Sequence, residues 1–275
     1  MRTVQHLVDH GMSLNGALRI CEVSKQKWYW RKKTRTPRVD ANLLEMILDI
    51  RKSRPFYGTR RVAAELTRRL GLPVNRKRIL RVYRLAGWSK PAPFKANTKA
   101  RWKPIKAIRP NQIWQTDITY VWCGQTDGWC YCFNILDVFT RQWIAYRFDT
   151  LAAADVSVSS LVEAVATVKP DCSRLTIQCD NGSQYAGKKF RKAASHLGIR
   201  LKFIWKSTPQ QNGHIESFHG TLKREYIWPH DFSNYQQAED VISEAFRDYN
   251  RNRLHSALKY VPPDEFMASW EAENK

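Results

Sequence analysis

The sequence predicts an α/β fold, in which a mixed five-stranded sheet with flanking helices follows small all-α helix-turn-helix modules. The second half of the chain opens with three successive runs rich in β-branched and aromatic residues, and then alternates helical and strand patterns. The first 88 residues instead carry short amphipathic segments, with Ser, Asp or Asn before several of them and Gly after others. A chain of 275 residues has room for two or three small domains.

The first expected module covers residues 1–33. Ser13 and Ser24 are positioned to cap its second and third short helices. Lys25 and Lys27 on the third helix are candidate DNA contacts, because a basic helix behind a tight turn suits a major groove. A simple helical hairpin explains the same pattern equally well, so both interpretations stay open.

A second, strongly basic helix-turn-helix module is expected at residues 40–88. Residues 51–106 contain 18 Lys and Arg and one acid, so they supply +17 of the formal net charge of +21. This concentration of charge favours binding to a phosphate backbone, which releases counterions. The candidate DNA contacts on the third helix of this module are Arg76, Lys77, Arg78, Arg81 and Arg84.

Residues 89–110 contain four prolines among basic residues, which predicts an extended linker. The α/β domain is expected at residues 111–228, and a C-terminal helical extension at residues 229–275. The expected strands are Ile113–Trp122, Trp129–Asp137, Ile144–Phe148, Leu175–Cys179 and Arg200–Phe203.

Three acidic residues occupy positions that this fold could bring together. Asp117 lies within the first strand, Asp180 ends the fourth strand, and Glu216 lies early in an amphipathic helix, off its buried face. Taken singly, each has an ordinary explanation as a turn residue or a solvated surface charge. Together they are the ligands that hard divalent cations prefer, and two such ions can activate the attacking oxygen and stabilise the leaving oxygen of a phosphoryl transfer.

Basic residues follow the acid of this helix. Lys223 returns two helical turns after Glu216 to nearly the same side, and Arg224 lies beside it. His214, His219 and Gln210 are further candidates for DNA contact, with ordinary loop and helix surface as the alternative.

Asp137, at the end of the second strand, is a rival acid for the site. Its context, LDVFTR, favours a strand-ending turn in which Asp137 pairs with Arg141.

Composition excludes several other classes. The six cysteines lack paired Cys-x-x-Cys spacing, so neither zinc nor disulfides are expected. No apolar run approaches the ~18 residues of a transmembrane helix, and a signal-peptide core is missing. A cytoplasmic protein without a membrane partner is therefore expected.

The segments around the three acids are WQTDITY, CDNGSQY and TPQQNGHIESFHGTLKREY, with 35 residues between Asp180 and Glu216. They resemble the DDE core of retroviral integrases and bacterial insertion-sequence transposases, and most of all the long-reading-frame (OrfB-type) transposases of two-frame elements. The resemblance extends over nearly the whole chain, to the tail YNRNRLHSALKYVPPDEF. It implies a ribonuclease-H-like domain in which Asp117, Asp180 and Glu216 hold two Mg²⁺ ions, with Mn²⁺ as a substitute. It also implies that Lys223 contacts DNA near the site.

The same resemblance implies a DNA transposase that binds the terminal inverted repeats of its element and joins them to target DNA. Such a protein is expected to work as a homodimer or higher oligomer at the nucleoid of a prokaryote, and an upstream reading-frame product is a candidate further partner.

Two other functions stay open from the residues alone. A DNA-binding regulator explains the basic modules but has no use for the acids. A structure-selective nuclease of the same fold explains the acids, and its products would be cleaved but never joined.

Overall fold

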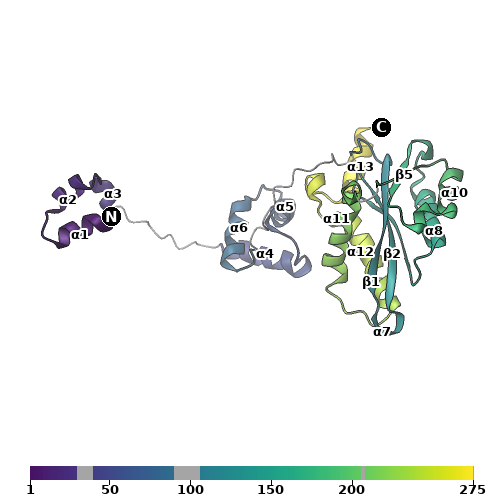
Figure 1. Ribbon diagram of the computed structural model, residues 1–275, viewed down its shortest axis with the longest axis horizontal. Helices are drawn as coiled ribbons and strands as arrows, with labels where there is room; N and C mark the ends of the chain where they lie inside the picture. Colours follow the sequence, from purple (N-terminus) through teal and green to yellow (C-terminus); the bar gives the residue numbers. More distant parts are fainter. Residues whose placement is uncertain (30–39, 90–105, 206–207, 275) are drawn as a thin grey trace. The chain divides into compact units, whose positions relative to one another are not determined.

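The computed structural model describes residues 1–29, 40–89, 106–205 and 208–274 (Figure 1). They form two compact units, Met1–Ala41 and Asn42–Lys275. Most of the expected proline-containing linker, residues 90–105, lies outside the described residues. The domain boundaries expected from the sequence stay predictions.

The N-terminal unit contains three short helices: α1 (Arg2–Asp9), α2 (Leu14–Ile20) and α3 (Lys25–Tyr29). Ser13 Oγ accepts a hydrogen bond from the backbone N–H of Gly16, and Ser24 Oγ accepts one from that of Lys27. Both predicted helix caps are therefore confirmed. The side chains of Lys25 and Lys27 are exposed.

The second unit begins with the basic helical module: α4 (Ala41–Ser53), α5 (Thr59–Leu70) and α6 (Arg76–Leu85). Gly71 ends α5 with φ +66°, a conformation that favours glycine. Asn75 caps the N-terminus of α6, because its side chain accepts the N–H of Lys77 at 2.9 Å. The amphipathic pattern of α6 buries Ile79, Val82 and Tyr83 and leaves its basic side chains outside.

A five-stranded sheet with the order β3-β2-β1-β4-β5 forms the centre of the α/β domain. Strand β1 is antiparallel to β2 and parallel to β4, so the predicted mixed sheet is confirmed. The strands are β1 (Ile113–Trp122), β2 (Trp129–Asp137), β3 (Trp143–Asp149), β4 (Thr176–Cys179) and β5 (Arg200–Phe203).

Helices cover both faces of the sheet (Figure 1). One face packs against α8 (Ala154–Val168) and α10 (Lys188–His196), and the other against α11 (Gly213–Leu222) and α12 (Tyr235–Arg251). A π-helical segment, Lys223–Ile227, continues α11. Two short helices were not expected from the sequence, α7 (Gly124–Asp127) and α9 (Ser183–Ala186). Helix α13 (Pro263–Glu273) lies in the segment where a C-terminal helical extension was expected. In the described part of the chain, no helix is both long and apolar enough to cross a membrane.

The basic helical module contacts the α/β domain through ion pairs that reach the continuation of α11. Arg54 forms a two-pronged ion pair with Asp248 of α12, and Asp248 also accepts the hydroxyl of Tyr226 at 2.8 Å. Arg61 Nη1 lies 3.8 Å from Glu225 Oε1. Glu225 and Tyr226 belong to the π-helical segment, so the basic module is tied to the polypeptide that follows Glu216.

The Arg54–Asp248 pair allows a test of this contact. Both side chains are about three-quarters buried (23% and 26% exposed), so Asp248→Arg should lower the free energy of unfolding by ~2–4 kcal/mol. The double exchange Arg54→Asp with Asp248→Arg should recover part of that loss. Chemical unfolding of the single and double variants measures the coupling.

The exposed pair Arg68–Glu265 provides the matched control, because its side chains are 42% and 44% exposed. Its exchange should change the free energy of unfolding by less than ~1 kcal/mol. Equal effects of the two exchanges would contradict the contact as described.

Candidate active site

The central strands bring two of the predicted acids to the same level of the sheet. Strands β1 and β4 are parallel neighbours, and their register pairs Gln115 with Gln178. Asp117 and Asp180 each follow two residues later, on the same side of the strands as these glutamines. Asp117 lies in the middle of β1 and Asp180 directly follows the end of β4, so two adjacent parallel strands bring the two carboxylates to the same level of the sheet.

Gln115 and Gln178 also fix the start of the helix that carries the third acid. Both side chains are fully buried, and both donate to the backbone carbonyl of Gln211, at 2.9 and 3.0 Å. The side-chain oxygen of Gln115 accepts the N–H of Ile215 at 3.0 Å. Glu216 is the next residue, so the two strands hold its helix directly beside the two aspartates.

The site is electrostatically strained in the DNA-free chain. Burial, together with the negative charges of Asp180 and Glu216, raises the pKa of Asp117 to about 7. Burial raises the pKa of Glu216 as well. Lys223 acts in the opposite direction on Asp117, because its positive charge favours the ionised carboxylate.

Among the residues that the structure describes, no three His, Cys, Asp or Glu side chains are close enough to hold a metal ion. The expected convergence of the three acids is therefore met in part. Their strands and helix lie side by side and their charges interact, but their oxygens do not form a finished coordination shell. Their role as metal ligands stays a proposal.

His219 lies inside the site and is not an exposed DNA contact. Its ring is buried, and burial together with the charge of Lys223 lowers its pKa to about 3, so the ring is neutral. Asn134, the residue opposite Asp117 on β2, donates its amide to Nε2 at 3.1 Å. The proton of the ring is thus on Nδ1, which lies 3.6 Å from the Asp117 carboxylate. His214 is half-buried, and the side chain of Gln210 lies outside the described part.

Asp137 has the structural role that its turn context predicted. Its carboxylate accepts the backbone N–H groups of Asn111, Phe139 and Thr140 at 2.7, 2.7 and 2.8 Å. The predicted side-chain pair with Arg141 is wrong, since backbone amides satisfy this carboxylate and Arg141 Nη1 is buried without a hydrogen bond. Arg141 instead donates its backbone N–H to the carbonyl of Asp137 at 3.0 Å.

The candidate DNA contacts separate into two groups. Lys223 and Arg224 begin the π-helical segment behind Glu216; Lys223 is half-buried toward the site, and Arg224 is exposed. The second group consists of exposed basic side chains of α6: Arg76, Lys77, Arg78, Arg81 and Arg84.

Sequence reasoning missed the two buried glutamines and assigned His219 to the wrong environment. A signal for the glutamines was present, because WQTD and IQCD both place Gln two residues before the acid. In a strand this spacing puts the amide and the carboxylate on one face. A signal for His219 was present too, because it lies four residues after Ile215 and three before Leu222, on the same apolar side of the helix.

The fold and the site define a class: a ribonuclease-H-like domain with acidic residues on its central strands, joined to a basic helix-turn-helix module. Family models agree with this organisation. The HTH-like domain matches residues 38–93, and two models of the integrase core domain match residues 107–209 and 197–263.

Similar proteins define the family further. The chain is 30% identical over 233 residues to the insertion element IS600 31 kDa protein of Shigella sonnei. The matched region covers 80% of this chain and 84% of that protein. It is 30% identical over 239 residues to the transposase InsD for insertion element IS2D of Escherichia coli. This match covers 83% of this chain and 79% of that protein. The HTLV-2 integrase catalytic core in complex with magnesium matches 59% of this chain and 99% of its own, with 15% identity and a TM-score of 0.47.

The chain therefore belongs to the insertion-sequence transposases with an integrase core domain. It is a DNA transposase, and its reaction class is polynucleotidyl transfer.

Gln115 provides a test of how Glu216 is held. Gln115→Met removes both hydrogen bonds to the start of α11, so DNA cleavage should fall ~10–100-fold while binding to the element ends is unchanged. Gln178→Met should cost less, because the Gln211 carbonyl keeps its bond from Gln115. Cleavage assays and end-binding titrations on the two variants measure this difference. If the Gln115→Met protein cleaved DNA within about 2-fold of the wild type, Gln115 would not be needed to hold the Glu216 helix in place.

Proposed function

We propose that this transposase cuts DNA at the ends of its insertion element and joins the new 3′ ends to target DNA. In this proposal Asp117, Asp180 and Glu216 hold the divalent metal ions. The strongest support is the β1–β4 register, which pairs Gln115 with Gln178 two residues before each aspartate, together with the buried amides that hold the Glu216 helix against these strands.

The residues suit a hard cation. All three donors are carboxylates, and burial together with the charges of Asp180 and Glu216 raises the pKa of Asp117 despite the opposing charge of Lys223. Two Mg²⁺ ions are the expected cofactors, with Mn²⁺ as a substitute. When bound, such ions activate the attacking oxygen and stabilise the leaving oxygen.

Each chemical step is an in-line displacement at phosphorus. In cleavage, a water oxygen forms the new bond to phosphorus while the bond to the 3′ oxygen breaks, and the departing oxygen takes up a proton. In joining, the 3′-hydroxyl of the element end forms a bond to a target phosphorus, and the 3′ oxygen of the target leaves. One bond replaces another in each step, so no covalent protein–DNA intermediate or energy cofactor is needed.

The basic groups have separate tasks in this proposal. Lys223 and Arg224 bind phosphates beside the scissile bond, and the exposed residues of α6 bind the terminal inverted repeats. Lys25 and Lys27 add contacts from the N-terminal unit. Because two ends are joined to one target, we expect a homodimer or higher oligomer at the host nucleoid. A fused or associated upstream reading-frame product is a further expected partner.

The substitution Asp180→Asn tests the assignment, since it removes one negatively charged oxygen donor with little change in shape. It should lower cleavage and joining by at least ~1,000-fold and leave end binding intact. Labelled DNA from the flanks of the encoding gene, incubated with MgCl₂ or MnCl₂, reports both products.

Asp155→Asn is the matched control, because this acid pairs with Lys189 on the exposed surface, with 70% of its side chain accessible. It should retain wild-type activity. Products that are cleaved and never joined would favour the nuclease, and end binding without any metal-dependent product would favour the regulator. Full activity of the Asp180→Asn protein would show that Asp180 is not a required metal ligand.

A further inference from the structure

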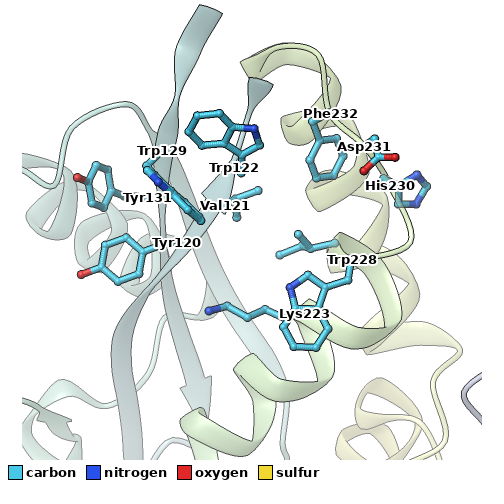
Figure 2. A pocket seen from close by; sticks show the side chains of 11 residues that line it. Tyr120, Val121, Trp122, Trp129, Tyr131, Lys223, Trp228, His230, Asp231 and Phe232 are labelled. Atoms are coloured by element: carbon cyan, nitrogen blue, oxygen red, sulfur yellow. The ribbon is translucent and has the colours of Figure 1, made fainter. Parts of the chain in front are cut away.

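An aromatic cleft of about 790 Å³ lies beside Lys223. Its walls carry Tyr120 and Trp122 of β1, Trp129 and Tyr131 of β2, and Trp228 after the π-helical segment (Figure 2). Four of these rings are strongly exposed, with accessible fractions of 54% for Tyr120, 42% for Trp122, 57% for Trp129 and 67% for Trp228. The metal-binding chemistry proposed above makes no use of these rings.

The rings are arranged in cross-strand pairs that leave ring surface open. Tyr120 lies opposite Tyr131 and Trp122 opposite Trp129 in the β1–β2 register. Both pairs are T-shaped, with ring centroids 5.4 Å apart. A T-shaped pair covers only part of each ring, so a further planar group can stack on the open faces.

The cleft and the proposed active site meet at Lys223. Tyr120 follows Asp117 by three residues on β1, about 10 Å along the strand, and lies on the opposite face of the strand, because side chains alternate. Strand β1 pairs with β4 through Ile113–Gln115 alone in the described part of the sheet, so the segment between Asp117 and the cleft lies on an open edge. Lys223 belongs to both places, because it lines the cleft and its charge acts on Asp117.

We propose that the aromatic cleft binds unpaired bases of the DNA strand whose phosphate lies at the proposed active site. This inference rests on the proposed function. A phosphodiester inside a duplex reaches converging carboxylates more readily when the neighbouring bases leave the stack, and exposed aromatic rings replace the lost stacking for any base. The Lys223 ammonium, which Figure 2 shows pointing toward the β1–β2 strands, provides the positive charge that the connecting phosphates need.

The chemistry of the lining favours bases over a protein partner. The aliphatic residues of the cleft, Val121 and Ile227, are 0% and 6% exposed, so the accessible apolar surface of the cleft is aromatic. The lining contains one acid, Asp231, and one lysine, Lys223, so the cleft lacks the strong positive charge that would select an acidic peptide. A symmetric contact between two copies of the cleft would leave both hollows unfilled, because two concave surfaces do not complement each other.

Photocrosslinking tests the proposal without relying on catalysis. A duplex carrying the element end, with 5-iododeoxyuridine at one of the first four positions beside the cleavage site, is bound to the Asp180→Asn protein and irradiated. We expect crosslinks to peptides that contain residues 120–131 or Trp228. Retained end binding with crosslinks only to other peptides would overturn the proposal.

Two substitutions at Trp228 distinguish stacking from general apolar contact. Trp228→Phe keeps an aromatic face, whereas Trp228→Leu keeps apolar volume without one. In an otherwise wild-type chain, Trp228→Leu should lower cleavage of fully paired ends about 10-fold, and Trp228→Phe should stay within about 2-fold. Mismatched ends, whose bases are already unpaired, should restore Trp228→Leu to within about 2-fold of the wild type.

The outcomes separate this proposal from the proposed function. If bases crosslink to the cleft but the wild type gives no metal-dependent product, the base-binding cleft is supported and the proposed transposition chemistry is contradicted. If instead Trp228→Leu changes the sedimentation of the DNA-free protein and leaves the crosslinks unchanged, the cleft is an interface between copies and the proposal is wrong.

Discussion

The geometry of the candidate active site depends on two buried side-chain amides. Gln115 and Gln178 lie side by side on the central parallel strands, and both donate to the backbone carbonyl of Gln211. Gln115 also accepts the N–H of Ile215, which fixes the first turn of α11 one residue before Glu216. A buried amide that lost these partners would cost ~1–3 kcal/mol, so the loop and the helix are held in one register against the sheet. The strands carry two acids, and the amides bring the third to them.

This arrangement favours function over the stability of the metal-free chain. Burial and two neighbouring acids raise the pKa of Asp117 from 3.8 to about 7. Because the folded-state value is the higher one, the charged carboxylate destabilises the fold. That loss is absent below the unfolded value near 3.8, grows as the pH rises, and is complete above about 7. A bound cation would offset this loss of stability, so the unfavourable charge of the site favours the binding of a metal ion.

Local patterns in the sequence predicted much of this fold. Strands β1 and β2 have the predicted bounds, because their β-branched and aromatic runs are long and end at clear turn residues. The exposed position of Glu216 also followed from the spacing of Ile215, Phe218 and Leu222, which are buried. Long-range contacts were not visible: Gln115 and Gln211 are 96 residues apart, and no local pattern connects them. The hydrogen bond between His219 and Asn134, 85 residues apart, and the π-helical turn after α11 depend in the same way on packing that forms only in the folded chain.

The central claim is that Asp117, Asp180 and Glu216 form one metal site whose carboxylates repel each other when no cation is bound. Thermal unfolding of the DNA-free protein at pH 8, with increasing MnCl₂, tests it most directly when wild type and Asp117→Asn are compared. The account predicts that Asp117→Asn melts ~2–4 °C higher than the wild type without metal, because it lacks the destabilising charge. It also predicts that Mn²⁺ raises the melting temperature of the wild type and has little effect on the variant. An equal rise in both proteins would contradict the account, because the metal would then bind without Asp117.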